Sequence, residues 1–329
     1  MAVLVTGGGG YIGSHMVLAL VDAGEKVVVL DDLSTGFRWA VSPEATFVLG
    51  DVSDGDLVRR IVAEHEINSV IHFAARIVVP DSVADPLGYY FANTVKTRAL
   101  LEAVVDAGVP HFIFSSTAAV YGMVGTEPVM EDAALAPISP YGRSKLMSEW
   151  MLKDTAFAFP LRYVALRYFN VAGADPAGRS GQSTTGATHL IKVACETALG
   201  KRPGIEVYGT DYPTPDGTCL RDYIHVSDLV AAHLDALNHL RGGGESRVFN
   251  CGYGRGYSVL EVLETVKSVS GVDFPVRYSP RRPGDPAAIV AKADLIRAEL
   301  GWTPKLDDLP VIVRTALDWE RQLGARRNT

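Results

Sequence analysis

The sequence predicts an α/β protein with a doubly wound parallel sheet and a smaller C-terminal α/β lobe. Two observations carry this prediction. Short apolar runs alternate with helical patterns through the first half of the 329 residues, and loops rich in glycine, proline and arginine interrupt the chain after about Asn170. Alternating β and α segments are typical of parallel sheets. A chain of this length also exceeds a typical single core and suits two lobes.

Strands are expected where short apolar runs end at glycine or polar residues. The first run is followed by helical spacing over residues 12–23, which stops at Gly24. Because helices cover both faces of a parallel sheet, each strand should be buried on both sides. The runs that we expect to form strands are residues 2–6, 27–30, 46–49, 69–73, 111–115 and 164–169.

The second half of the chain has a less regular texture. Residues 172–186, 209–217 and 278–286 read as loops, whereas residues 222–250 look like one more helix and strand that can return to the main sheet. We therefore expect a discontinuous boundary between two domains. The first comprises residues 1–169 with about 222–250, and the second comprises residues 170–221 and 251–329.

Charge and cysteine content exclude several classes of protein. The net charge is −7, which argues against a nucleic-acid or anionic-membrane partner. The three cysteines, Cys195, Cys219 and Cys251, are too far apart for a zinc motif, and their odd number disfavours a disulfide framework. We find no leader peptide and no apolar run of membrane-spanning length. These features predict a cytoplasmic protein.

The glycine-rich loop from Gly7 to Gly13 predicts a dinucleotide site. It follows the first strand and opens a helix, and Gly7, Gly10 and Gly13 are spaced three apart. Glycine permits the tight turn and the close approach of a pyrophosphate, which the free N–H groups of a helix N-terminus bind. Asp31 closes the second strand, 18 residues past Gly13, where a carboxylate accepts hydrogen bonds from ribose hydroxyls and repels a 2′-phosphate. NAD is therefore expected rather than NADP.

Tyr141 and Lys145 form a Tyr-x-x-x-Lys pattern, which places both on one face of a helix. A lysine ammonium at about 5 Å, with an effective dielectric near 20, would lower the tyrosine pKa by about two units. That shift would bring the phenol toward general-base chemistry near neutral pH. Thr117, at the end of the predicted strand before this helix, can hydrogen-bond a substrate oxygen that gains or loses a proton.

Several motifs together resemble the extended short-chain dehydrogenase/reductases, and within them the enzymes that epimerise UDP-sugars at C4. The similarity spans nearly the whole chain. It implies a Rossmann fold and an isomerase that interconverts UDP-galactose and UDP-glucose through a 4-keto intermediate, with tightly bound NAD. The matching stretches are VTGGGGYIGSH, VIHFAA, FSSTAAVYG, SPYGRSK, LRYFNVAGADP, DGTCLRDYIHVSDL and RRPGD.

The resemblance also implies roles for individual residues. It assigns catalysis to Thr117, Tyr141 and Lys145, and no metal. Residues that match cofactor contacts are Gly7, Gly10, Tyr11, Ile12, Gly13, Asp31, Asp51, Val52, Phe73, Ala74, Asn93, Lys145 and Tyr168. Residues that match UDP-sugar contacts are Thr117, Tyr141, Asn170, His189, Leu190, Val207, Tyr208, Arg221, Tyr223, Arg282, Asp285 and Ile289. The chemistry of Arg221 and Arg282 agrees, since a guanidinium fork suits an anionic diphosphate.

Ala118 and Ala119 discriminate within the family. Related dehydratases carry Asp-Glu at these places, and related decarboxylases carry a glutamate two residues after the threonine. Methyl groups cannot move protons, so dehydration and decarboxylation are disfavoured. Two residues depart from the family pattern: Ile77 replaces a frequent lysine, with Arg76 beside it, and His189 replaces a frequent asparagine. Imidazole can still donate one hydrogen bond, whereas the role of Arg76 is left open.

Three alternatives remain at this stage: a 4-epimerase of another nucleotide sugar, a net oxidoreductase, and a non-enzymatic NAD-binding protein. Ile289 bears on the first, because a bulky tyrosine at this place excludes N-acetylated sugars and isoleucine is intermediate in size. UDP-N-acetylglucosamine, UDP-pentoses and UDP-uronates therefore stay open as substrates. Family members are usually homodimers joined by a four-helix contact, to which residues 100–105 and 146–152 could contribute.

Overall fold

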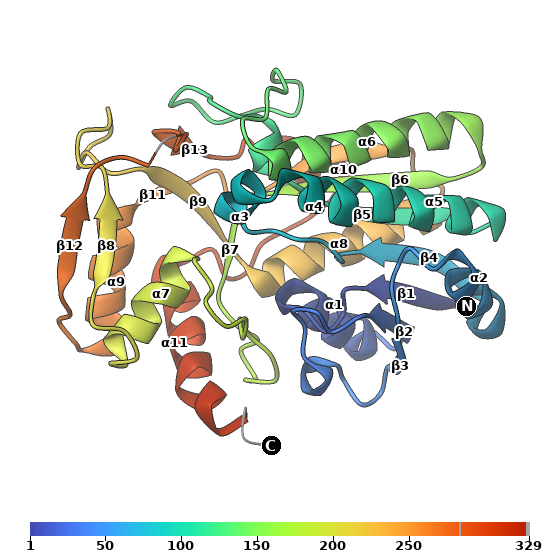
Figure 1. The fold of residues 1–329 in the computed structure, drawn as a ribbon, viewed down its shortest axis with the longest axis horizontal. Coiled ribbons are helices and arrows are strands. Elements are labelled where there is room, and N and C mark those ends of the chain that lie inside the picture. The colour runs from blue at the N-terminus through green and yellow to red at the C-terminus, as the bar shows by residue number, and fades with distance from the viewer. Residues whose placement is uncertain (283, 327–329) are drawn as a thin grey trace.

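The computed structural model describes residues 1–282 and 284–326 and has a large lobe and a smaller one (Figure 1). The large lobe contains a parallel sheet with the strand order β10-β6-β5-β4-β1-β2-β3. Its strands are β1 (Ala2–Thr6), β2 (Lys26–Asp31), β3 (Thr46–Leu49), β4 (Ile67–His72), β5 (His111–Thr117), β6 (Arg162–Tyr168) and β10 (Arg247–Cys251).

Helices cover both faces of this sheet, as a doubly wound fold requires. Alternate side chains of β1 point to opposite faces: Val3 and Val5 join the hydrophobic core under α1 (Tyr11–Asp22) and α8 (Val226–Arg241), whereas Leu4 joins the core on the other side. The second core contains residues of α2 (Gly55–His65), α5 (Lys96–Asp106) and α6 (Pro140–Ala158). Two short helices, α3 (Val79–Ala84) and α4 (Pro86–Tyr90), pack against α6.

One strand differs from its expected burial. β3 lies at the edge of the sheet, and its residue Leu49 is 65% exposed. The prediction that each strand is buried on both faces is therefore wrong for β3, because an apolar run of four residues does not reveal whether a strand is central or at an edge. The other predicted strands match the structure to within three residues at each end.

The chain returns to the main sheet late in the sequence. β10 pairs with β6 in parallel, and α8 leads into it. The segment just before α8 is instead β9 (Leu220–His225), which belongs to a separate small sheet. The expected helix and strand within residues 222–250 are thus present. The placing of the domain boundary stays a prediction, and residues 283 and 327–329 of the second domain lie outside the described part of the chain.

The smaller lobe combines two small sheets with helices. β9 pairs with β7 (Asn170–Ala172), β11 (Gly256–Ser258) and β13 (Ala288–Ile289), and β8 (Ile205–Tyr208) pairs with β12 (Val276–Ser279). The helices α7 (Leu190–Ala198), α9 (Val259–Ser270) and α11 (Leu309–Arg326) pack on one another. A short helix, α10 (Asp294–Leu300), contacts α8 and β10. Because β6 leads directly into β7, the carboxyl edge of the main sheet faces this lobe (Figure 1).

Candidate active site

The glycine loop joins β1 to α1 and leaves no room for side chains. Gly7 has a φ of 73°, and a Cβ atom there would lie 2.6 Å from the backbone nitrogen of Ala74. A Cβ atom at Gly13 would lie 2.1 Å from the Gly7 carbonyl oxygen. Gly10 is the N-cap of α1 and provides no side-chain cap, so the free N–H groups of Tyr11 and Ile12 remain available for an anion.

Asp31 lies beside this loop, at the end of β2. Its carboxylate accepts hydrogen bonds from the backbone N–H of Gly9 at 2.8 Å and of Leu33 at 2.7 Å. Burial raises the pKa of Asp31, while these two N–H donors lower it. The following segment folds over the loop, since the N–H of Phe37 donates to the Gly9 carbonyl at 2.9 Å. Asp31 therefore braces the glycine loop, and its contact with the ribose of the cofactor stays a prediction.

An aromatic contact ties this cofactor side of the molecule to the smaller lobe. Trp39, two residues after Phe37, stacks on Trp319 of α11 with ring centroids 6.3 Å apart. The rest of the predicted cofactor rim comes from the ends of the other strands. Asp51, which follows β3 and precedes Val52, is paired with Lys96 of α5. Phe73, next to Ala74, and Tyr168 both contact His233 of α8.

Asn93 sits in a single π-helical turn, η2 (Phe91–Val95), between α4 and α5. Its amide clamps the backbone of Arg76, accepting from its N–H at 2.8 Å and donating to its carbonyl at 2.9 Å, and it also donates to Ser144 of α6 at 3.0 Å. π-Helical turns are frequent at functional sites. In this structure Asn93 orders the segment after β4, so its predicted cofactor contact stays a prediction.

Arg76 does not replace the missing lysine here. Its guanidinium donates to Asp85 at 2.7 Å and lies 4.6 Å from the ring centroid of Tyr89. Ile77, next to it, is exposed. The side chain of Arg76, whose role could not be assigned from the sequence, is thus held by α4 and by the N-cap residue of that helix.

The predicted catalytic residues meet at the end of β5. Ser139 caps α6 by accepting from the N–H of Gly142 at 3.1 Å, and Pro140 fits the first turn, so Tyr141 is fixed beside the strand end. Thr117 is the hydrogen-bond partner of Tyr141. Lys145, one turn along α6, is buried and donates to the carbonyl of Ser115 at 2.8 Å.

The electrostatic balance at Tyr141 differs from the expected one. Burial raises the pKa of Tyr141 to about 12, and the hydrogen bond to Thr117 is the contact that lowers it. The sequence predicts that Lys145 lowers the pKa of Tyr141, but the Lys145 ammonium is directed to Ser115. Burial also lowers the pKa of Lys145 itself to about 7. The helical spacing correctly predicted that Tyr141 and Lys145 share one face of α6, but it could not predict that both side chains are buried.

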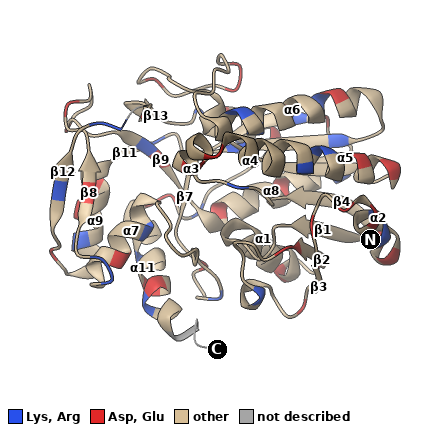
Figure 2. Cartoon of the chain, viewed as in Figure 1, with Lys and Arg blue, Asp and Glu red and all other residues tan. Residues whose placement is uncertain are grey.

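The predicted UDP-sugar residues come from both small sheets. Within the first, Asn170 of β7 is in register with Tyr223, and Ile289 of β13 is in register with Arg221. Arg221 donates to the carbonyl of Pro286 at 2.9 Å, and its guanidinium lies 3.7 Å from Asp285. Figure 2 shows basic segments on β9 and β12, with basic and acidic residues mixed along the rest of the chain.

The second small sheet supplies the other predicted residues. Val207 is buried in β8, and the next residue, Tyr208, lies under the guanidinium of Arg282 at 4.0 Å from the ring centroid. Arg282 also approaches Asp285 at 3.9 Å. Asp285 therefore lies between two arginines, which are the positive charges that a diphosphate needs.

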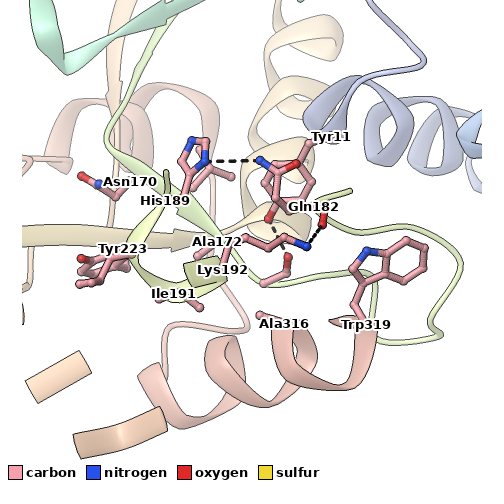
Figure 3. Close-up of a pocket in the computed structure, with 13 residues that line it drawn as sticks. Tyr11, Asn170, Ala172, Gln182, His189, Ile191, Lys192, Tyr223, Ala316 and Trp319 are labelled. Carbon is pink, nitrogen blue, oxygen red and sulfur yellow. Dashed lines mark hydrogen bonds between the residues drawn. The ribbon is translucent and has the colours of Figure 1, made fainter. Parts of the chain in front are cut away.

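A pocket lies between Tyr11, at the start of α1, and residues of the smaller lobe (Figure 3). Its lining includes the predicted residues Tyr11, Asn170, His189, Leu190 and Tyr223. Gln182 donates to Nδ1 of His189 at 3.4 Å. A neutral ring that accepts at Nδ1 carries its proton on Nε2, which leaves one donor, as expected for this departure from the family.

Residues 3–252 match the model of the NAD dependent epimerase/dehydratase family. The chain belongs to this family. A UDP-glucose 4-epimerase of Azospirillum brasilense is 58% identical over 321 residues, which cover 98% of this chain and 92% of that protein. The crystal structure of a Brucella ovis UDP-glucose 4-epimerase in complex with NAD has 45% identity and a TM-score of 0.94, covering 96% of this chain and 97% of the other.

A third comparison extends the match to the whole chain. A UDP-glucose-4-epimerase from Stenotrophomonas maltophila, with bound NAD and formylated UDP-arabinopyranose, has 40% identity and a TM-score of 0.96, with both chains covered in full. The predicted resemblance, the Rossmann-type fold and the NAD cofactor are confirmed by these matches. The uncapped helix N-terminus, the crowded glycines and Asp31 fit NAD in this member of the NAD dependent epimerase/dehydratase family.

Some residues of this epimerase-family site were missed by sequence reasoning. Gln182 and Trp319 line the pocket, and they come from a loop and from the C-terminal helix (Figure 3). Neither belongs to a periodic pattern or a motif, so no local signal could have found them. Among residues 1–282 and 284–326, no cluster of histidine, cysteine or carboxylate side chains could hold a metal. No helix in that same part of the chain is long and apolar enough to cross a membrane.

Proposed function

We propose that the protein is a UDP-glucose 4-epimerase that interconverts UDP-galactose and UDP-glucose and keeps its NAD bound. The observation that carries the proposal is the A. brasilense relative, which matches 98% of this chain and so includes the lobe with the sugar-nucleotide residues. NAD held by the glycine-rich loop and Asp31 would supply a reversible hydride acceptor for C4 of the sugar, which would allow a 4-keto form.

The side chains of this protein supply the proton transfer. Tyr141, as the phenolate, removes the proton of the sugar 4-hydroxyl and gives it back after the keto sugar has turned over. Thr117 hydrogen-bonds Tyr141 and lowers its pKa, which favours the phenolate. Lys145 lies one turn further on the same helix, where its ammonium can hold the nicotinamide ribose.

The sugar must turn over while the nucleotide stays in place. Arg221 and Arg282 provide positive charge for the diphosphate, and both approach Asp285 from different segments. Ala118 and Ala119 follow Thr117 in the short 3₁₀ turn η3 (Ala118–Val120). Their methyl groups cannot donate or accept protons, so the keto intermediate is not diverted to dehydration.

The proposal is tested by mixing purified protein with UDP-galactose, without added NAD, and following the anomeric signals by NMR. We expect an equilibrium mixture of UDP-galactose and UDP-glucose. Heat-denatured protein is the control. Steady accumulation of NADH absorbance would instead indicate a net oxidoreductase, and no change of either kind would refute the proposal.

We further propose a homodimer, with a contact different in detail from the expected one. Within residues 100–105, Leu100, Leu101 and Val104 are core residues. Their side chains are therefore not available for a contact with a second copy. The exposed apolar residues lie on neighbouring helices: Leu87 is 79%, Phe91 56% and Trp150 54% exposed. A second copy of the chain would cover this face (Figure 1).

Analytical ultracentrifugation tests the dimer. The protein should sediment at about twice its chain mass of 35.3 kDa, and Phe91→Glu should shift it to the monomer. Val272→Glu, at an exposed apolar residue elsewhere, is the control. We also propose a cytoplasmic location, supported by the three cysteines being buried free thiols. Recovery of the protein from a periplasmic fraction would contradict it.

A further inference from the structure

A buried ion pair lies behind the catalytic helix. Nε of Arg167 donates to Oε1 of Glu149 at 3.0 Å, and Nη2 donates to Oε2 at 2.7 Å. The side chains of Arg167 and Glu149 are only 4% and 5% exposed. Charges this far from water are costly to bury, and apolar residues often replace such pairs without loss of stability. The pair therefore calls for a reason beyond stability.

The ion pair is connected to the surroundings of two proposed catalytic residues, Thr117 and Lys145. Glu149 also accepts a hydrogen bond from Ser116, which precedes Thr117 at the end of β5. Arg167 immediately precedes Tyr168 at the end of β6. Glu149 itself stands one turn after Lys145 on α6, and residues four apart share one face of a helix. Both side chains are buried against β5.

The other charged and titratable groups near Lys145 do not provide a negative charge. On β4, His72 is held neutral by burial, which lowers its pKa to about 3, with a smaller lowering by Lys145 itself. On α6, Tyr141 is a phenol whose pKa is raised by burial to about 12. On β6, burial likewise raises the pKa of Tyr168. Burial lowers the pKa of Lys145 to about 7, and the charge of Glu149 opposes that change.

We propose that Glu149, held in place by Arg167, is a positioning residue that keeps Lys145 in its charged form at the cofactor side of the active site. Arg167 fixes both carboxylate oxygens, and its Nη1 continues to the hydroxyl of Tyr121 at 2.9 Å and the carbonyl of Glu131 at 3.0 Å. These contacts therefore fix the orientation of the Glu149 carboxylate. The inference rests on the proposed epimerase activity, for which a charged Lys145 is required.

Two single variants separate this role from a purely structural one. Glu149→Gln and Arg167→Gln break the same ion pair, so both should lower the melting temperature. Only Glu149→Gln removes the negative charge next to Lys145. We expect the alkaline limb of its kcat–pH profile to move to lower pH by roughly one to two units, since a charge about 5–10 Å away is worth that much at an effective dielectric near 20. In Arg167→Gln the limb should stay in place or move to higher pH.

The pH profiles of the variants are compared with that of the parent protein, with UDP-galactose as the substrate. The NAD content of each protein is measured after denaturation. If the parent has no epimerase activity, the proposed function fails. If the parent is active but both variants move the limb equally, or neither moves it, Glu149 has no role through Lys145 and this inference fails. Should either single variant not fold, Glu149→Gln/Arg167→Gln leaves no unpaired buried charge. It should fold and still show the limb at lower pH, and an unmoved limb would overturn the inference.

Discussion

The backbone N–H of Gly9, in the loop after β1, donates a hydrogen bond of 2.8 Å to the carboxylate of Asp31, at the end of β2. One side chain therefore does two things. It braces the glycine-rich loop, and we propose that it also places a negative charge where the 2′-phosphate of NADP would lie.

Asp31→Asn tests both consequences. The amide retains one acceptor oxygen, so the loop loses a charge-assisted hydrogen bond, and we expect about tenfold weaker NAD binding to the apo-protein. NADP binding should weaken less, because the repulsion is removed, so the preference for NAD should fall. Isothermal titration calorimetry with both cofactors measures this. Asp32→Asn, at the adjacent exposed aspartate that bonds only Ser34 in the structure, is the control. An unchanged NAD preference in Asp31→Asn would contradict the role.

Tyr141→Phe should abolish epimerase turnover. Without the phenol there is no group to take the proton of the sugar 4-hydroxyl, and loss of a general base costs about 10²–10⁴-fold in kcat. NAD content should remain as in the parent, since the ring still fills the same space. Tyr163→Phe, at a buried tyrosine of β6 in the core, should keep its activity. Near-normal turnover by Tyr141→Phe would remove the proposed mechanism.

Ile289 should tune which sugars are accepted. It is in register with Arg221 and packs against the cluster that contains Ala118 and Phe169, next to the catalytic threonine. A larger side chain should fill space needed by an N-acetyl group. We expect Ile289→Tyr to lower kcat/KM for UDP-N-acetylglucosamine about tenfold or more relative to UDP-galactose, with Ile289→Val as the control. If the parent does not turn over the N-acetylated substrate, its use by this protein is ruled out.

Acid should destabilise the protein through its buried histidines. Burial lowers the pKa of His72 to about 3, and of His15, His225 and His233 to about 4, below the ordinary value of 6.5. As pH falls from 6.5 to 4, the unfolded chain takes up protons that the folded protein cannot, so stability is lost in this window. Each histidine contributes up to about 1.4 kcal/mol per pH unit.

Urea unfolding followed by circular dichroism between pH 7.5 and 4.5 measures this loss. Asp222 works in the opposite direction: burial raises its pKa to about 6, so it costs stability as pH rises toward that value. Four histidines should outweigh one carboxyl. His72→Gln should flatten the slope, because the amide can keep the bonds to Thr6 and Thr97 without titrating. His239→Gln, at a partly exposed position, should leave the slope unchanged, and an equal effect of both variants would contradict the explanation.

Local patterns were sufficient for much of the cofactor half of the molecule. Gly7, Gly13 and Asp31 are specified by backbone geometry within one β-α-β unit, and the structure shows the crowding that demands glycine there. Tyr141 and Lys145 share a helix, so their spacing alone places them on one face. These relationships span few residues, and short-range geometry is what a sequence records directly.

The substrate half depended on resemblance, because its residues lie far apart in the chain. Asn170, Arg221 and Ile289 meet only when three strands pair in one small sheet. Burial was equally hidden: spacing could not show that Leu49 is exposed, that Leu100, Leu101 and Val104 are core residues, or that Lys145 bonds Ser115.

The sequence by itself determined the fold class, the cofactor loop and the shared face of the catalytic pair, because each follows from a local repeat or a local steric demand. Only the tertiary structure decided the charge balance of the site. Arg167 is a charged residue within an apolar strand, and nothing near it in the sequence identifies its partner. Glu149 lies 18 residues away, and the two meet because burial leaves each charge no other way to be satisfied.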